Sequence, residues 1–194
     1  MSWFQYLVVF SRFCHTTLVV CLCDELAGRQ NSHITHELAT YKLIPDFVFS
    51  CCTWFPKKKA VEGLIELGKQ IHSEEKIIES IFKFKHHDGD SCLTALFEMP
   101  NLYRFRNNGK FPSGPMLVDI EESCAYLIQL AKSAKLDLNK ILNHTDKVGQ
   151  TLFSRASNYS EKMTKQLLME NVRVNSVDVL FVTPFFRVRL KIDF

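Results

Sequence analysis

The sequence predicts an all-α fold in which helical hairpins stack into a solenoid. A turn-and-helix pattern that begins at Asp146 returns, with substitutions, 32 residues later at Asp178. Upstream, apolar residues recur at helical spacing, and turn-forming or capping residues stand where such helices would begin and end. Because a unit of this length cannot bury its apolar helices alone, neighbouring units are expected to stack on one another.

The first copy of the repeat has residues suited to a tight turn followed by a capped helix. Gly149 suits a turn that needs positive φ, and the hydroxyl of Thr151 can cap a helix N-terminus. Ala156 would let the first helix approach its neighbour closely. In the second copy, Thr183 and Pro184 occupy the cap and the first helical position. The second helix would bury three apolar side chains: Met163, Leu167 and Leu168.

This pattern resembles the ankyrin-repeat family, whose unit runs D-x-x-G-x-T-P-L-H-x-A-A and then L-L-x-x-G-A-x-V-N, with a period near 33. The chain departs from it at Leu152 and Ser154, in place of Pro and His, and at Asn171, in place of the loop glycine. The resemblance is clear over residues 146–184 and implies protein binding without catalysis. The matching positions are Asp146, Gly149, Thr151, Ala156, Leu167, Leu168, Val174, Asn175 and Asp178.

The spacing of the repeat predicts how the rest of the chain is divided into units. Residues 1–56 are expected to form an irregular N-terminal segment, and residues 57–194 an ankyrin-type helical-hairpin solenoid with degenerate repeats. Thr94 follows turn-like residues and is expected to correspond to Thr151, with the excess length placed in a loop at residues 101–119. The expected units are residues 57–87, 88–145 with the inserted loop, 146–177, and an incomplete 178–194.

The order of apolar and polar residues predicts further structure at the two ends of residues 57–194. Apolar residues at helical spacing predict helices over residues 60–72 and 74–85, with Ser73 as the N-cap of the second. Residues 186–194 alternate apolar and polar side chains with the period of a strand, although register places a first repeat helix there. For the apolar C-terminal end, we favour a fragment of a longer ankyrin protein or a divergent ending. The alternatives are cover by a partner, by a second copy, or by the N-terminal segment.

Composition limits the class of protein. The chain has 194 residues, of which 46% are apolar, and a formal charge of +3, too small to indicate nucleic acid or a membrane as partner. The seven cysteines are an odd number without framework spacing, which indicates reduced thiols and a cytoplasmic protein, with the nucleus as a second possibility.

The apolar stretch at residues 3–23 raises the question of a membrane. Arg12 and His15 interrupt it before it reaches the roughly 18 residues that a span needs. No basic residue precedes the apolar run, as a signal peptide would require. A packed helix or strand is favoured, with a signal or anchor segment and disorder as alternatives. A membrane-anchored or secreted ankyrin-like protein is accordingly the alternative reading.

No chemistry-bearing motif is evident. Zinc sites usually need converging cysteine and histidine pairs, but no C-x-x-C occurs and no second half is suitably spaced. Nucleotide-binding and hydrolase motifs are also absent from the sequence. We therefore expect no enzyme, metal or cofactor, and a cysteine- or zinc-dependent enzyme is the least favoured reading. The ligand pairs considered are Cys21/Cys23, Cys51/Cys52, His33/His36 and His86/His87.

The expected partner is another protein, bound by turn tips, first helices and the inserted loop. Aromatic and arginine side chains in that loop could also stack on a nucleic-acid strand, but without a second basic cluster nearby no nucleic acid is expected. Self-association through the apolar C-terminal end is a further possibility. The candidate contact residues are Lys147, Val148, Gln150, Arg155, Asn158, Val179, Phe181, Tyr103, Arg104 and Arg106.

Overall fold

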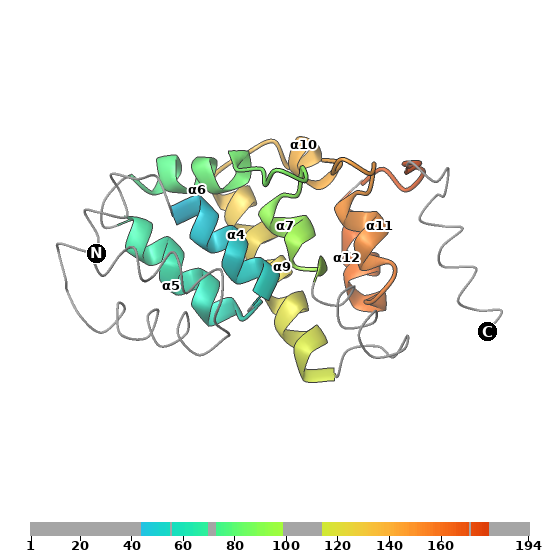
Figure 1. The fold of residues 1–194 in the computed structure, drawn as a ribbon, viewed down its shortest axis with the longest axis horizontal. Coiled ribbons are helices and arrows are strands. Elements are labelled where there is room, and N and C mark those ends of the chain that lie inside the picture. Colours follow the sequence, from blue (N-terminus) through green and yellow to red (C-terminus); the bar gives the residue numbers. More distant parts are fainter. Residues whose placement is uncertain (1–43, 55, 70–72, 99–113, 171, 179–194) are drawn as a thin grey trace.

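The computed structural model describes residues 44–178 apart from 55, 70–72, 99–113 and 171 (Figure 1). This part of the chain is helical and has no strand, apart from an isolated antiparallel bridge between Thr145 and Thr151, so the expected all-α class holds there. The helices are α4 (Ile44–Trp54), α5 (Lys58–Lys69), α6 (Glu74–Lys83), α7 (Cys92–Ala95), α9 (Gly114–Ser133), α10 (Leu138–Leu142), α11 (Leu152–Ala156) and α12 (Glu161–Met169).

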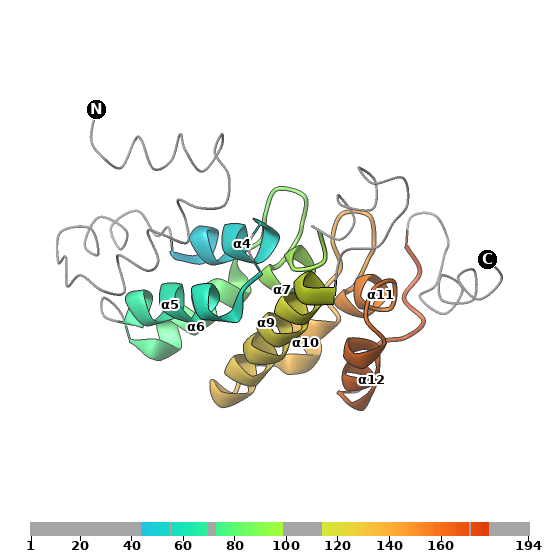
Figure 2. The same cartoon turned by 90° about the horizontal axis from the view of Figure 1, so that it is seen from below.

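These helices lie in a row along the long axis of the molecule. Figures 1 and 2 show α5 and α6 toward one end, α4, α7 and α9 in the middle, and α11 with α12 toward the other end. One apolar core runs through the row. Its fully buried side chains include Ile65, Ile81, Leu93, Leu127 and Met163.

The predicted helix-turn-helix pair is present as α5 and α6. Ser73 occupies the N-cap position of α6, but its side chain makes no capping hydrogen bond. The buried face of α6 follows the predicted spacing, with Ile77, Ile78 and Ile81 inside. Apolar periodicity was therefore sufficient to locate this hairpin.

Two segments expected to be irregular contain helices. Within residues 1–56, the aromatic and cysteine-rich stretch forms α4, which buries Val48 and Cys52 and contacts α5, α6 and α7. The expectation of a loop up to residue 119 is wrong from Gly114 onward, because α9 begins there. Helix α9 buries Ile120 and Leu127, and this burial outweighs the nearby turn-forming residues.

The apolar stripe of α12 is narrower than expected. Met163 and Leu167 are fully buried, whereas Leu168 is 49% exposed, so its expected place in the core is wrong. Consecutive residues on a helix point about 100° apart, and the side of α12 that buries Leu167 leaves Leu168 largely outside the core.

Several expectations concern residues outside the described part. They include the apolar N-terminal stretch, the strand-like alternation of residues 186–194, and the cap formed by Thr183 and Pro184. Among the described helices, none combines the length and the apolar character needed to cross a bilayer.

Candidate functional site

Two turns of the same design precede the short helices α7 and α11. In each turn a glycine has positive φ, +81° at Gly89 and +79° at Gly149. Two residues later a hydroxyl side chain caps the helix: the Oγ of Ser91 accepts from the amide of Thr94, and Oγ1 of Thr151 accepts from the amide of Ser154. Glycine thus recurs where the turn needs positive φ, and a small hydroxyl residue recurs where the helix N-terminus needs a capping acceptor.

This geometry corrects the register expected from the sequence. The counterpart of Thr151 is Ser91, three residues before the expected Thr94. Thr94 is the other half of a capping box, in which its Oγ1 accepts from the amide of Ser91 at 2.9 Å. Gly89 and Gly149, which lie 60 residues apart in the sequence, are therefore equivalent positions.

The turns contact one another directly. The amide of Lys147 donates to the carbonyl oxygen of Asp88 at 3.1 Å. A Cβ atom on Gly89 would come within 3.0 Å of the Lys147 nitrogen, and one on Gly149 within 3.0 Å of the Asp178 Cα. Gly89 thus lies against residues 146–147, and Gly149 lies against residues 177–178. We call residues 86–90, 146–150 and 177–178 together the turn row.

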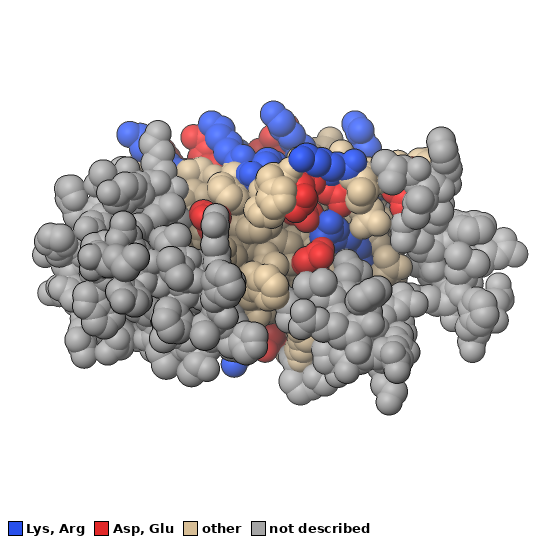
Figure 3. Space-filling model, in the orientation of Figure 1, with Lys and Arg blue, Asp and Glu red and all other residues tan. Residues whose placement is uncertain are grey.

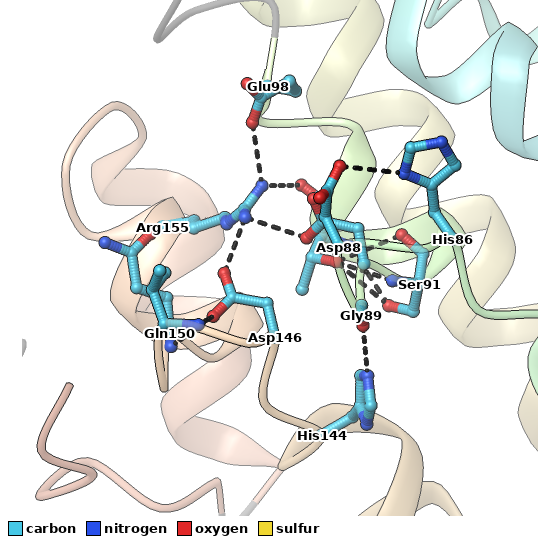
Figure 4. A network of polar contacts seen from close by, with 12 residues as sticks. His86, Asp88, Gly89, Ser91, Glu98, His144, Asp146, Gln150 and Arg155 are labelled. Atoms are coloured by element: carbon cyan, nitrogen blue, oxygen red, sulfur yellow. Dashed lines mark hydrogen bonds and ion pairs between the residues drawn. The ribbon is translucent and has the colours of Figure 1, made fainter. Parts of the chain in front are cut away.

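A histidine also links the first two turns. Nε2 of His144 lies 2.7 Å from the carbonyl oxygen of Gly89, a contact shown in Figure 4. Burial lowers the pKa of His144, although the hydrogen bond to Gly89 opposes that shift. The neutral ring then donates its Nε2 proton to the carbonyl oxygen.

Behind the turn row, Arg155 of α11 joins the two turn-and-helix units. Its Nη2 lies 2.7 Å from Oδ2 of Asp146 and 2.8 Å from Oδ1 of Asp90. Its Nη1 lies 3.2 Å from Oε2 of Glu98 and donates to the carbonyl oxygen of Thr94 at 3.1 Å. Figure 4 shows the guanidinium pointing into this group of acceptors. Arg155 therefore bonds its own turn and the preceding unit at once.

In this network one guanidinium, that of Arg155, faces three carboxylates. Burial, the largest effect, lowers the pKa of Arg155, but the carboxylates of Asp90, Asp146 and Glu98 more than offset it and raise the pKa overall. The contact to Asp90 is an ion pair without hydrogen-bond geometry. Arg155 was expected to lie exposed as a partner contact, but it is only 6% exposed because its guanidinium is paired with these carboxylates.

The other residues predicted to contact a partner differ in how exposed they are. Lys147 is exposed and Val148 is 45% exposed, both on the turn row. Gln150 is half-buried, and its amide donates to Oδ1 of Asp146. Asn158 is half-buried too, and its Nδ2 donates to the carbonyl oxygen of Ser154. Five candidates lie outside the described residues: Tyr103, Arg104, Arg106, Val179 and Phe181.

The exposed edge around the turn row combines apolar and basic side chains. Val177 is 51% exposed. Figure 3 shows lysine and arginine side chains, with acidic side chains among them, along the edge formed by α6 and α10. Beside this edge lies an open hollow of about 460 Å³. Its lining is entirely polar or charged: Asp137, Asn139, Lys140, Asn143, His144, Thr145 and Arg173.

The cysteines in the part of the chain that the structure describes lie in the core. Cys52, Cys92 and Cys124 come from three helices and are all buried. Burial raises the pKa of each, to about 12 for Cys92, so these groups are protonated and unreactive at neutral pH.

Sequence reasoning missed several residues of this site. Asp90, Glu98 and His144 were not singled out, because their roles depend on contacts across more than 50 residues of chain. Ser91 could have been found, since Gly89-Asp90-Ser91 has the same Gly-x-hydroxyl spacing as Gly149-Gln150-Thr151.

No protein-family model, curated protein or solved structure matches this chain. The function is therefore inferred from the turn row and its surroundings.

Proposed function

We propose that this chain is a non-catalytic protein-binding module built from degenerate ankyrin-type helical hairpins, acting as an adaptor or regulatory subunit. The observation that carries the proposal is the contact between equivalent turns: Gly89 lies against Asp146 as Gly149 lies against Asp178. Stacked units of this kind leave their turn tips and one helix face open to another polypeptide.

The composition of the turn row supports a protein partner. Val148 and Val177 offer apolar contact area, and the exposed Lys147 adds positive charge next to Val148 in the chain. Apolar contacts with a charged surround are typical of protein interfaces. The neighbouring polar hollow could take acidic or amide side chains from the same partner.

Other features agree with a non-catalytic intracellular role. The buried thiols Cys52, Cys92 and Cys124 are not paired in disulfides, as expected in a reducing compartment. Their raised pKa values make them poor nucleophiles. The proposal therefore includes a cytoplasmic location, with the nucleus as the second possibility.

Site-specific crosslinking tests the proposal. A photoreactive phenylalanine is placed at Val148 of the full chain, and in a control at Lys165, whose side chain is 72% exposed on α12. In extract from cells that express the protein, position 148 should give one saturable protein adduct and position 165 should not. Unlabelled wild-type protein should compete, whereas a Lys147→Glu, Val148→Asp variant should not. Equal adducts at both positions, or equal competition by the variant, would reject the turn row as the binding surface.

A further inference from the structure

Three consecutive side chains of the first turn converge on one point. Nδ1 of His86 lies 3.2 Å from Oδ2 of Asp88, and Nε2 of His87 lies 3.1 Å from the same oxygen. All three ligand atoms lie within 4.8 Å of one another, and the two imidazole ring centroids are 3.8 Å apart. Figure 4 shows the His86 ring directed at Asp88 on one side of the turn.

The turn backbone holds these residues in place. The amide of His86 donates to the carbonyl oxygen of Asp90 at 2.9 Å. The amide of Gly89 donates to the carbonyl oxygen of His86 at 2.8 Å. The carbonyl oxygen of Asp88 accepts from the Lys147 amide of the next turn. Contacts within the first turn and from the second turn therefore fix the backbone that carries the three side chains.

The His86 ring is also positioned from behind. It stacks on the ring of Phe49 in α4, with centroids 4.9 Å apart and planes 12° apart. Phe49 itself is only 7% exposed, so it is a fixed support. The side chains of His87 and Asp88 remain accessible, at 75% and 60% exposure. An ion from solvent can thus reach a partly preorganised set of ligands.

We infer that His86, His87 and Asp88 form a binding site for a divalent transition-metal ion of the Zn²⁺ type, with Nδ1, Nε2 and a carboxylate oxygen as the protein ligands. At zinc–ligand distances of about 2.0–2.2 Å, tetrahedral ligands lie about 3.4 Å apart, close to the two contacts observed here. Imidazole and carboxylate groups are suitable ligands for this ion.

Three protein ligands leave coordination positions open for water or for an added side chain. The site lies on the turn row, so a bound ion would be available to a docking polypeptide. The metal site itself does not depend on the proposed binding function. Because bound imidazoles must be deprotonated, metal affinity should fall as the solution is acidified.

Cobalt(II) binding to the full chain tests the inference, since a cobalt spectrum distinguishes nitrogen and oxygen ligands from thiolates. The variants are His87→Ala and Asp88→Asn, which alter exposed side chains. The control is Glu79→Gln, which removes another exposed carboxylate, 51% exposed, from α6. Circular dichroism confirms that each variant is folded.

Wild-type protein and the control should bind one Co²⁺ that shows visible absorption without a thiolate charge-transfer band, and Zn²⁺ should displace it. The two ligand variants should bind that ion at least about tenfold more weakly. In nitrogen-15 spectra, Zn²⁺ should shift Nδ1 of His86 and Nε2 of His87. Unchanged affinity in both variants, a thiolate band accounting for all bound metal, or shifts confined to other histidines would overturn the assignment.

Discussion

Replacing Arg155 by methionine tests whether the two turn-and-helix units are joined as the structure indicates. Methionine retains an unbranched apolar stem but removes the guanidinium. The Asp146 side chain, 2% exposed, and the Asp90 side chain, 12% exposed, would then lose their counter-charge. The carbonyl oxygen of Thr94 would also lose its donor.

The expected loss of unfolding free energy follows from the burial of the two aspartate side chains. Removing one partner of a buried ion pair costs about 3–5 kcal/mol, because the remaining charge stays desolvated. Glu98 contributes less, since its side chain is 36% exposed and screened by solvent. We therefore expect Arg155→Met to lower the free energy of unfolding by about 4 kcal/mol. With an m value of about 2 kcal/mol per M, the urea midpoint would fall by about 2 M.

Urea unfolding followed by circular dichroism measures this change. The matched control is Lys165→Met, which breaks a pair with Glu161 whose side chains are 72% and 82% exposed. Because solvent screens this pair, that substitution should change the urea midpoint far less than Arg155→Met does. If Arg155→Met is no more destabilising than the control, the guanidinium does not link the two units and the buried network is wrong.

Four further substitutions test other parts of the structure, all by equilibrium unfolding. Leu167→Ala should cost about 3 kcal/mol and Leu168→Ala less than about 1 kcal/mol, because only Leu167 is buried; similar costs would place α12 incorrectly. Gly149→Ala should cost more than about 1 kcal/mol, since φ is +79° and the added Cβ meets the next turn; a neutral effect would exclude this turn geometry. The pKa of His144 is lower in the folded than in the unfolded chain, so its contribution to stability is present above pH 6.5 and lost as the pH falls below that value. His144→Gln should reduce the loss of unfolding free energy on acidification below that pH. An unchanged slope of unfolding free energy against pH would exclude His144 as the source of this loss.

The turn and cap chemistry could be predicted from the sequence because it is local. Gly149 and Thr151 fulfil backbone requirements that depend on their neighbours in the chain, and both adopt the expected conformations. The α5–α6 hairpin was found for a similar reason, since apolar side chains at helical spacing identify a buried face.

Contacts between distant segments could not be predicted in this way. Arg155 lies in the short helix after the N-cap Thr151 and resembles a solvent-facing helix residue. Its burial depends on contacts with the distant Asp90 and Glu98 as well as with the nearby Asp146. Leu168 was misplaced because the sequence alone does not show on which side α12 meets its neighbour. Residue identity alone pairs Thr94 with Thr151, whereas the backbone geometry selects Ser91.

The direct contact between equivalent turns is the central claim, and the hydrogen bond from the Lys147 amide to the Asp88 carbonyl tests it most directly. Triple-resonance NMR of the full chain can detect the scalar coupling across this bond and the proton contacts between Gly89 and Asp146. We predict a measurable coupling between Lys147 nitrogen and Asp88 carbonyl carbon, together with slow exchange of the Lys147 amide. A rapidly exchanging Lys147 amide with no contacts to residues 86–90 would contradict stacking of the two turns.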